Sequence, residues 1–330
     1  MSKIIDRISE STLLSKRTID FLTGGRLRNI DEIIDIKDIN KYFSNEISHQ
    51  LVYNLTHVER GRKLYKLIEH ILPDNTNLSV LDIGSGVGGA LIAFGEKGFE
   101  LHGIELSANR KELSEENFAI NNLKANIFSI DLCNNILDAK YDVVICNSVI
   151  EHVNDPMKMM IRFGDLLNPG GVLLFGVANH EAMGNVISDP HYGLFGLTLL
   201  INPWARHYYS LMAGDKQSYS VTEWLSIKSY LSIIEDVVGP AQLIPPQDEL
   251  RGVESVPELL SRLASGYMKA ANDKKLEKNK PSLIQLSNAF AHYMGELSAA
   301  YSHTLSGLIS EDEFKNKYVR KSFYIVSKKQ

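Results

Sequence analysis

The stretch SVLDIGSGVGGALIAFGEKGFELHGIE, residues 79–105, decides the fold. Its apolar run 80–83 predicts a buried strand, and the glycines that follow let the chain turn sharply and let a ligand approach the backbone. Residues 90–97 predict a helix whose first amide groups face the turn, and residues 99–105 predict a second strand that ends at Glu105. This arrangement predicts a site for an adenosine-containing cofactor, in which the carboxylate accepts hydrogen bonds from a ribose.

The glycine spacing fits two kinds of cofactor site. Gly84-x-Gly86-x-x-Gly89 matches the dinucleotide fingerprint. Asp82-x-Gly84-x-Gly86-x-Gly88 resembles motif I of the class I S-adenosylmethionine (SAM)-dependent methyltransferases. The turn alone leaves this choice open, so the rest of the chain has to decide it.

Length and composition narrow the class of protein. A chain of 330 residues allows one large α/β domain with additions, or two domains. Its net charge of -5 argues against a broad nucleic-acid surface. Cys133 and Cys146 form no CxxC pair, so we expect neither a zinc site nor a disulfide framework, and we assign no metal ligands. Neither a signal peptide nor an apolar run of ~20 residues is visible, which indicates a cytoplasmic protein.

Strand and helix patterns alternate between residues 79 and 178, after a helical extension over residues 1–75 that we expect to pack beside or over the glycine turn. This rhythm predicts an α/β fold with a Rossmann-like, doubly wound, mostly parallel sheet. The predicted strands are 79–84, 99–105, 125–130, 141–147 and 171–178. The predicted helices are 88–97, 107–122 and 154–167.

The alternation of strand and helix patterns ends after residue 178. Residues 179–220 are rich in aromatic side chains, glycine and histidine, and follow the carboxyl end of a strand, so we expect a lid over the substrate. A helix is predicted over 221–237, a short strand near 240–245 and a final strand over 322–327. We therefore expect a cofactor-binding core of residues 76–250 and 318–330. A helical insertion over 251–317, with its helices at 254–310, is broken by a polar loop at 272–281.

Three later features favour SAM over a nicotinamide cofactor. Asp131 follows a strand, residues 141–156 read YDVVICNSVIEHVNDP, and residues 167–175 read LNPGGVLLF. All three resemble the quinone-biosynthesis-like small-molecule methyltransferases of the class I superfamily, strongly over 79–178 and more weakly over 221–237 and 322–327. The resemblance implies a seven-stranded sheet with an antiparallel last strand, SAM as cofactor and S-adenosylhomocysteine as product. A nicotinamide enzyme is the main rival.

The resemblance also implies which residues bind the cofactor. It assigns the turn to the methionine end, Glu105 to the ribose, Asp131 and the Leu132 amide to adenine, and the end of the fourth strand to the region of the sulfonium. Arg60 is a further partner for the methionine carboxylate, although pairing with Glu59 is the commoner situation for such an arginine. The full set is Asp82, Gly84, Ser85, Gly86, Gly88, Glu105, Leu106, Asp131, Leu132, Asn147, Ser148 and Arg60.

Two histidines are candidates for a general base. His152 follows the fourth strand beside Glu151, and a histidine titrates near neutral pH; the alternative is an imidazole that only holds the backbone. His191 lies in a predicted turn, residues 189–193. The alternative for His191 is a turn histidine of the lid that takes no part in catalysis. Tyr192, His207 and Tyr209 are expected to line the acceptor pocket, unless they are packing residues of the lid.

The expected activity is methyl transfer to a hydroxyl oxygen of a sugar, a phenol or a natural-product intermediate. One alternative is a membrane-associated enzyme for a prenylated or lipid-linked acceptor, with the apolar stretch 192–204 in peripheral contact with the bilayer. Methylation of carbon or nitrogen, a macromolecular acceptor and a non-catalytic binding protein are further alternatives. No nucleic-acid partner is expected, and residues 254–310 are a candidate element for a homodimer or a lid.

Overall fold

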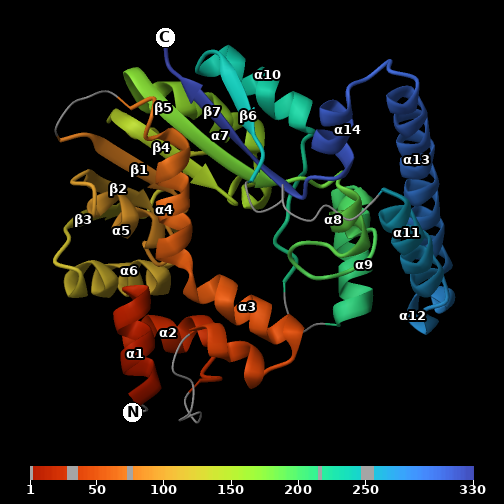
Figure 1. Cartoon of the computed structure of the whole chain (residues 1–330), viewed down its shortest axis with the longest axis horizontal. Coiled ribbons are helices and arrows are strands. Elements are labelled where there is room, and N and C mark those ends of the chain that lie inside the picture. Colours follow the sequence, from red (N-terminus) through yellow and green to blue (C-terminus); the bar gives the residue numbers. More distant parts are fainter. Residues whose placement is uncertain (1–2, 28–35, 73–76, 215–217, 247–255) are drawn as a thin grey trace. The chain divides into compact units, whose positions relative to one another are not determined.

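The chain divides into two compact units in the computed structural model (Figure 1). The structure describes residues 3–27, 36–72, 77–214, 218–246 and 256–330. Unit 1 consists of Met1–Asn147, Arg162–Leu174 and Ser327–Gln330, and unit 2 consists of Ser148–Ile161 and Phe175–Val326. Within the part of the chain that is described, no helix combines the length and the apolar character needed to cross a membrane.

A seven-stranded sheet carries the alternating segment, which confirms the predicted fold. Its strands are β1 (Ser79–Ile83), β2 (Glu100–Ile104), β3 (Ala125–Phe128), β4 (Tyr141–Asn147), β5 (Leu167–Ala178), β6 (Ala241–Ile244) and β7 (Ser322–Lys328). Their order across the sheet is β3-β2-β1-β4-β5-β7-β6. β1 pairs in parallel with both β2 and β4, so the strand order reverses at β1. In open α/β sheets, ligands bind at the carboxyl ends of the strands that flank such a point.

The last strand runs antiparallel to β5, as predicted. Near the start of β5 the Gly170 amide donates to the Lys329 carbonyl, and the Lys329 amide donates to the Gly171 carbonyl. Beyond the other end of β5, the Asn179 amide donates to the Lys321 carbonyl. Rising numbers on one strand therefore meet falling numbers on the other, and the two arrows point in opposite directions in Figure 1.

In unit 1, the N-terminal extension packs beside the glycine turn, as predicted. Its elements are α1 (Lys3–Thr12), α2 (Lys16–Thr23), η1 (Ile36–Lys41), α3 (Asn45–Leu55) and α4 (His57–Ile68). α4 packs on α5 (Gly89–Gly95), and α2 contacts α6 (Ala108–Ile120). The helices approach so closely that a Cβ placed on Gly89 would lie 2.5 Å from the His57 Cβ.

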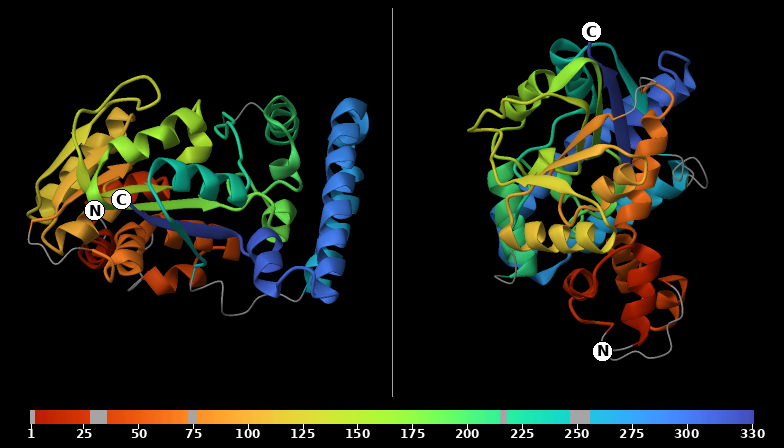
Figure 2. Two further views of the ribbon diagram at one scale, coloured as in Figure 1. Left: turned by 90° about the horizontal axis from the view of Figure 1, so that it is seen from above. Right: turned by 90° about the vertical axis from the view of Figure 1, so that its left-hand side faces the viewer.

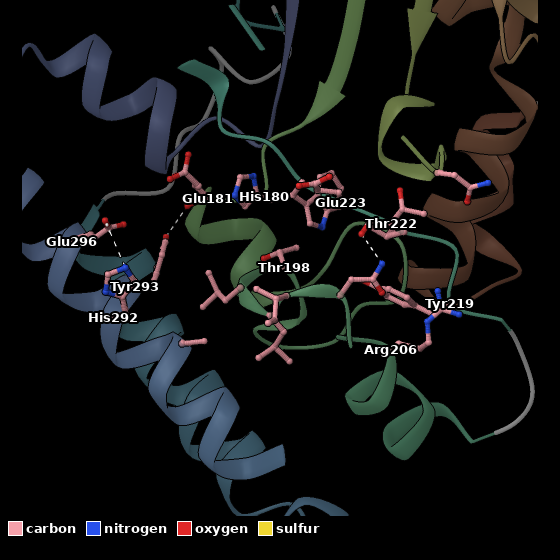
Figure 3. Close-up of a pocket in the computed structure, with 18 residues that line it drawn as sticks. His180, Glu181, Thr198, Arg206, Tyr219, Thr222, Glu223, His292, Tyr293 and Glu296 are labelled. Atoms are coloured by element: carbon pink, nitrogen blue, oxygen red, sulfur yellow. Dashed lines mark hydrogen bonds and ion pairs between the residues drawn. The ribbon is translucent and has the colours of Figure 1, made fainter. Parts of the chain in front are cut away.

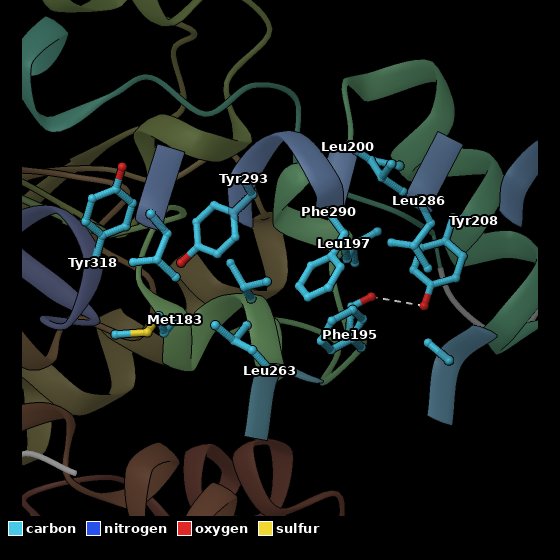
Figure 4. Packing of buried hydrophobic residues seen from close by; sticks show 14 of the residues in the cluster. Met183, Phe195, Leu197, Leu200, Tyr208, Leu263, Leu286, Phe290, Tyr293 and Tyr318 are labelled. Atoms are coloured by element: carbon cyan, nitrogen blue, oxygen red, sulfur yellow. Dashed lines mark hydrogen bonds between the residues drawn. The ribbon is translucent and has the colours of Figure 1, made fainter. Parts of the chain in front are cut away.

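Unit 2 has a hydrophobic core of its own, to which the predicted lid contributes (Figure 4). Phe195, Leu197 and Tyr208 from the lid pack with Leu263 of α11 and Phe290 of α13, and α13 lies beside α11 in Figures 1 and 2. The helices are η2 (Ile150–His152), α8 (Met183–Ile187), η3 (Leu197–Leu199), α9 (Asn202–Ala213), α10 (Ile227–Val237), α11 (Val256–Ala271), α12 (Lys274–Lys278), α13 (Lys280–Leu305) and α14 (Glu311–Tyr318). α7 (Pro156–Asp165) precedes β5.

Three predicted boundaries are wrong. The strand predicted over 171–178 already begins at Leu167. The helix predicted over 221–237 begins only at Ile227, because the Thr222 amide donates to the Glu151 carbonyl and holds the chain extended. The polar segment predicted as a loop over 272–281 contains α12 and the start of α13. Asp273 caps α12 by accepting a hydrogen bond from the Lys275 amide, and Asn279 caps α13 in the same way.

Most of the apolar stretch 192–204 is packed inside unit 2. Phe195, Leu197 and Leu200 are 9%, 1% and 8% exposed, and all three belong to the core cluster. Ile201 is the exception, with 71% of its surface exposed. The apolar side chains therefore contribute to folding of unit 2, and little of this surface remains for contact with a bilayer.

Candidate functional site

The glycine turn after β1 has one face closed by packing and one face open. Gly84, Gly86 and Gly88 all adopt positive φ angles of 73°, 57° and 83°, which glycine tolerates best. A Cβ on Gly88 would lie 2.6 Å from the Phe118 ring, so this glycine permits the packing of α6. On Gly86 a Cβ would meet only the Gly84 carbonyl, at 4.0 Å. The space over Gly86 is therefore free for a ligand, and the buried Ser85 hydroxyl lacks a partner among the described residues.

Glu105 is fixed beneath this turn. Its Oε2 accepts a hydrogen bond from the Gly86 amide at 2.9 Å, and its Oε1 accepts one from the Ser107 amide at 2.8 Å. The side chain is only 7% exposed. Each carboxylate oxygen has two lone pairs, so both retain capacity for the hydroxyls of a ribose. Next to it, Leu106 is 63% exposed and offers an apolar surface to a ring.

Asp82 adds a second buried carboxyl group to the site. It is 6% exposed, and burial together with the charge of Glu105 raises its pKa to about 7. Within the described part of the chain, neither a hydrogen-bond donor nor a cationic side chain contacts its carboxylate. Two buried carboxyl groups without a counter-ion attract a cation and repel a pyrophosphate. This favours a cationic cofactor over a dinucleotide.

Arg60 does not pair with Glu59. Its guanidinium lies 3.7 Å from the centroid of the Tyr53 ring, and its Nε has no hydrogen-bond partner among the residues described. Glu59 is approached instead by Arg62, at 3.5 Å. Arg60 thus retains hydrogen-bonding capacity for a ligand, and its role at the methionine carboxylate stays a prediction.

Asp131 caps the turn in which it lies. Its Oδ1 accepts a hydrogen bond from the Cys133 amide at 2.9 Å, and its Oδ2 accepts one from the Asn134 side chain at 2.6 Å. The Leu132 amide makes no hydrogen bond within the described chain. The structure thus places a free amide beside an oriented carboxylate. Their contact with adenine stays a prediction.

The chain is strained where β4 ends. Ser148 adopts a left-handed conformation with φ of 56°, and its amide donates to the Gly176 carbonyl at 2.8 Å. Such a conformation costs of order 1 kcal/mol for a residue other than glycine and is often found at functional sites. Within unit 1, Asn147 ends the strand whose Cys146 pairs with Ile83 of β1, one residue before the glycine turn.

In unit 2, Glu151, His152 and His191 form a cluster. Glu151 is 1% exposed; its Oε1 lies 3.7 Å from the His191 Nε2, and its Oε2 has no partner in the described chain. The His152 and His191 rings meet edge to face, 4.8 Å apart. One ligand atom from each residue lies within 4.8 Å of the others, so this trio also has the spacing to hold a metal ion.

Ser220 lies against the ring of His152. The His152 Nδ1 lies 3.2 Å from the Ser220 carbonyl oxygen and 3.3 Å from the Ser220 hydroxyl, which can donate or accept. Ser220 is itself held because its amide donates to the Tyr192 hydroxyl at 2.7 Å. Tyr192 therefore holds Ser220 beside His152, and its ring packs against Tyr209, 4.4 Å away.

The turn that carries His191 has the predicted form. The Asp189 carboxylate accepts hydrogen bonds from the amides of His191 and Tyr192, at 3.0 and 2.7 Å, and Gly193 has a positive φ of 69°. His207 lies elsewhere: its Nε2 is 3.2 Å from the Asn279 side-chain nitrogen. None of Tyr192, His207 and Tyr209 lines the cavity that lies beside this cluster.

A cavity of about 710 Å³ lies within unit 2, lined by segments from the lid, the chain after it and α13 (Figure 3). Trp224 connects it to the cluster, because Trp224 lines the cavity and its ring lies 5.7 Å from that of His191. Sequence reasoning missed its lining side chains, including Trp224 and Tyr293. The aromatic and histidine content of residues 179–220 predicted that this segment contributes to a substrate site. Nothing in the sequence predicted that side chains of α13 line the same cavity.

Residues 56–219 match the family model of a methyltransferase domain. The curated relatives include the ubiquinone biosynthesis O-methyltransferase of Rickettsia akari (strain Hartford), which is 24% identical over 47% of this chain and 66% of its own length. The corresponding protein of Coxiella burnetii (strain Dugway 5J108-111) is 30% identical over 44% of this chain and 60% of its own length. The chain thus spans about two thirds or less of these relatives.

Among solved structures, the chain is similar to a SAM-dependent methyltransferase from Archaeoglobus fulgidus. The TM-score is 0.46 at 13% identity, covering 83% of this chain and 94% of that one. A second, described as a SAM-dependent methyltransferase from Clostridium acetobutylicum ATCC 824, has a TM-score of 0.37 at 20% identity. It covers 45% of this chain and 61% of its own.

Proposed function

We propose that this chain, which belongs to the class I SAM-dependent methyltransferase superfamily, transfers a methyl group from SAM to a hydroxyl oxygen of a small-molecule acceptor. One observation carries the cofactor half of this proposal: Asp82 and Glu105 are both buried at the glycine turn. SAM has a positively charged sulfonium and an ammonium group, which suit such a site. It supplies a methyl group on a good leaving group.

Each binding element of unit 1 then has a task. The Glu105 oxygens accept the ribose hydroxyls, and the exposed Leu106 side chain packs against adenine. Asp82 faces the ammonium group, and the open surface of Gly86 admits the cofactor backbone close to the turn. This division of tasks explains why the turn needs an open glycine at one position and a packed one at another.

His152 is the proposed general base. A hydroxyl acceptor has to lose its proton as the new bond to carbon forms, and a positioned imidazole takes part in such steps. The Nδ1 of His152 faces Ser220, which holds the ring in place, and the imidazole receives that proton. The negative charge of Glu151 beside the two rings stabilises the imidazolium that results. His191, whose Nε2 lies 3.7 Å from the Glu151 carboxylate, helps to hold that carboxylate in place.

His152 follows β4 closely in the sequence. It follows Asn147, the last residue of that strand, by five positions, so the two lie at most about 18 Å apart along the backbone. In the superfamily fold, reaction takes place at this edge of the sheet. The acceptor itself stays open here between a sugar, a phenol and another hydroxylated intermediate, with carbon or nitrogen methylation as the alternative chemistry.

The test compares three histidine variants. We expect His152→Ala to lower kcat at least tenfold, and His191→Ala to lower it as well, while the affinity for S-adenosylhomocysteine measured by calorimetry changes little. His303→Ala, an exposed histidine in the last turn of α13, is the matched control and should keep full turnover. Turnover is followed as S-adenosylhomocysteine release across a panel of hydroxylated acceptors. Full activity in both His152→Ala and His191→Ala would contradict the assigned base.

A further inference from the structure

The cavity of unit 2 has a lining that suits a polar ligand. Of its 18 lining residues, five are aliphatic: Leu199, Leu200, Ile201, Val221 and Ala289. The others are polar, charged or aromatic side chains. Pockets for drug-like or apolar ligands of this size are lined mainly by hydrophobic groups, with a few polar ones for orientation. A prenylated acceptor would leave many polar groups here without partners, so the lining argues against one.

Two buried polar groups in the lining have no partner in the described part of the chain. They are the Thr198 hydroxyl, on a residue that is 3% exposed, and the indole Nε1 of Trp224. Leaving such a group without a hydrogen bond destabilises the folded chain. The indole nitrogen only donates, whereas a hydroxyl both donates and accepts. A ligand that is rich in hydroxyl groups satisfies both, because each of its hydroxyls can accept from one group and donate to another.

The part of the cavity wall formed by His180 and Glu181 carries no uncompensated charge. Burial, together with the charge of Lys317, lowers the pKa of His180 to about 4, so this ring is uncharged at neutral pH and offers one donor and one acceptor. Glu181 is paired with Lys317, whose Nζ lies 3.2 Å from its carboxylate. His180 and Glu181 lie next to each other at the top of the cavity in Figure 3. Neither presents an uncompensated charge to a ligand.

The cavity adjoins the proposed base. The Thr222 amide donates to the Glu151 carbonyl at 2.8 Å, and Thr222 lines the cavity. Trp224 lines it as well, with its ring 5.7 Å from that of His191. A ligand that hydrogen-bonds to Trp224 is therefore separated from His191 of the proposed catalytic cluster only by the Trp224 ring.

We propose that this cavity binds a saccharide, whose ring hydroxyls bond to Thr198, Trp224 and His180, and that a hydroxyl of the same saccharide is the methyl acceptor. The inference deepens the proposed function and rests on it. The acceptor O–H proton goes to the imidazole of His152. The acceptor oxygen forms a bond to the methyl carbon, and the carbon–sulfur bond breaks with its electron pair left on sulfur.

The tryptophans supply a direct reporter of the cavity. The chain contains two, Trp204 and Trp224, of which only Trp224 lines the cavity. The variant Trp204→Phe therefore emits from the cavity wall alone. With the full chain saturated by S-adenosylhomocysteine, we expect methyl glycosides of common pentoses and hexoses to change this emission saturably. The phenolic probe 3,4-dihydroxybenzoate should leave it unchanged.

Thr198→Val in the same background removes the unpartnered hydroxyl and keeps the shape of the side chain. We expect it to weaken glycoside binding at least tenfold and to leave the affinity for S-adenosylhomocysteine unchanged. Thr304→Val is the matched control: that hydroxyl bonds to the Ala300 carbonyl within α13 and is remote from the cavity lining, so glycoside binding should not change. Thermal unfolding of each variant checks that the chain is folded.

The outcomes separate the two proposals. If no glycoside changes the emission of Trp224, or if the phenolic probe binds instead, the saccharide assignment is overturned while the methyltransferase proposal stands. If Thr198→Val is folded and binds glycosides as the parent does, the assignment of the site to this cavity is overturned. If the chain fails to bind S-adenosylhomocysteine in the first place, the proposed function itself is refuted.

Discussion

Replacing Asp82 with asparagine should stabilise the cofactor-free protein and weaken its binding of SAM. Burial, together with the charge of Glu105, raises the Asp82 pKa from 3.8 to about 7. At about 1.4 kcal/mol per pH unit, this rise corresponds to at most about 4 kcal/mol of free energy of unfolding. The opposite effects on stability and on binding would mark a group that is retained for function at the expense of stability.

The direction of the pH dependence of stability follows from the protons that the folded and unfolded chains bind. Between about pH 4 and pH 7 the folded chain holds a proton on Asp82 that the unfolded chain has released, so the free energy of unfolding falls as the pH rises. Below this window both states are protonated and the penalty is absent, whereas above it the penalty is complete. An asparagine side chain does not titrate, so the free energy of unfolding of Asp82→Asn should not fall between pH 4 and pH 7 for this reason. The variant should therefore be more stable than the parent at pH 8, but not at pH 4.

Urea unfolding at both pH values, followed by far-ultraviolet circular dichroism, measures the effect. Tryptophan emission is unsuitable because Trp204 and Trp224 both belong to unit 2. Calorimetry should show SAM affinity about tenfold to a hundredfold lower, as expected for one hydrogen bond to a charged group. A variant that is less stable than the parent at pH 8, or one that keeps the parent's pH dependence, would refute the reasoning.

Asp142→Asn is a matched control, because the pKa of Asp142 is shifted in the opposite direction to that of Asp82. Burial alone would raise the pKa of Asp142, but hydrogen bonds from Ser79 and Asn168 lower it overall. Its stabilising effect is therefore present above its unfolded pKa and is lost as the pH falls through the folded one. Asp142→Asn should be less stable than the parent at pH 8 and should bind SAM normally, because Asp142 lies at the start of β4.

Two further predictions concern the turn and the histidine cluster. Gly86→Ala should cost about 1 kcal/mol of stability through its positive φ but lose SAM affinity, since its Cβ enters the open space. Gly88→Ala should cost more, about 1–3 kcal/mol beyond the same backbone strain, because its Cβ meets Phe118 at 2.6 Å. Urea unfolding and calorimetry separate the two, and equal stability losses would contradict the assigned roles. Dialysis against EDTA should leave turnover unchanged if His152 acts as a base. A loss that Mg²⁺ or Zn²⁺ restores would reassign Glu151, His152 and His191 to a metal ion.

The fold was predictable where the signal is local. Alternating apolar runs and glycine turns predicted strands β1 to β5 in order, and the short β-rich run at the C-terminus predicted β7. That β7 is antiparallel was implied by the resemblance to the methyltransferases. The errors arose where tertiary contacts or caps override local propensity. Thr222 is held by the Glu151 carbonyl and not by a helix, and Asp273 starts a short helix within a polar segment.

The candidate site was predictable in part for the same reason. The glycine turn and Glu105 are encoded in one continuous stretch, so their positions followed from the sequence. The burial of Glu151 and the lack of a partner for its Oε2 within the described chain depend on packing, which the sequence does not display. The cavity combines Trp224 with Tyr293 of α13, 69 residues later in the chain. Only the folded structure brings such distant segments together.

Calorimetric titration of the full chain with S-adenosylhomocysteine and with NADH tests the central claim most directly. The account predicts one saturable site for S-adenosylhomocysteine, lost in Glu105→Ala, and no heat of binding for NADH, because the buried carboxyls of Asp82 and Glu105 repel its pyrophosphate. Saturable binding of NADH, together with no binding of S-adenosylhomocysteine, would contradict it.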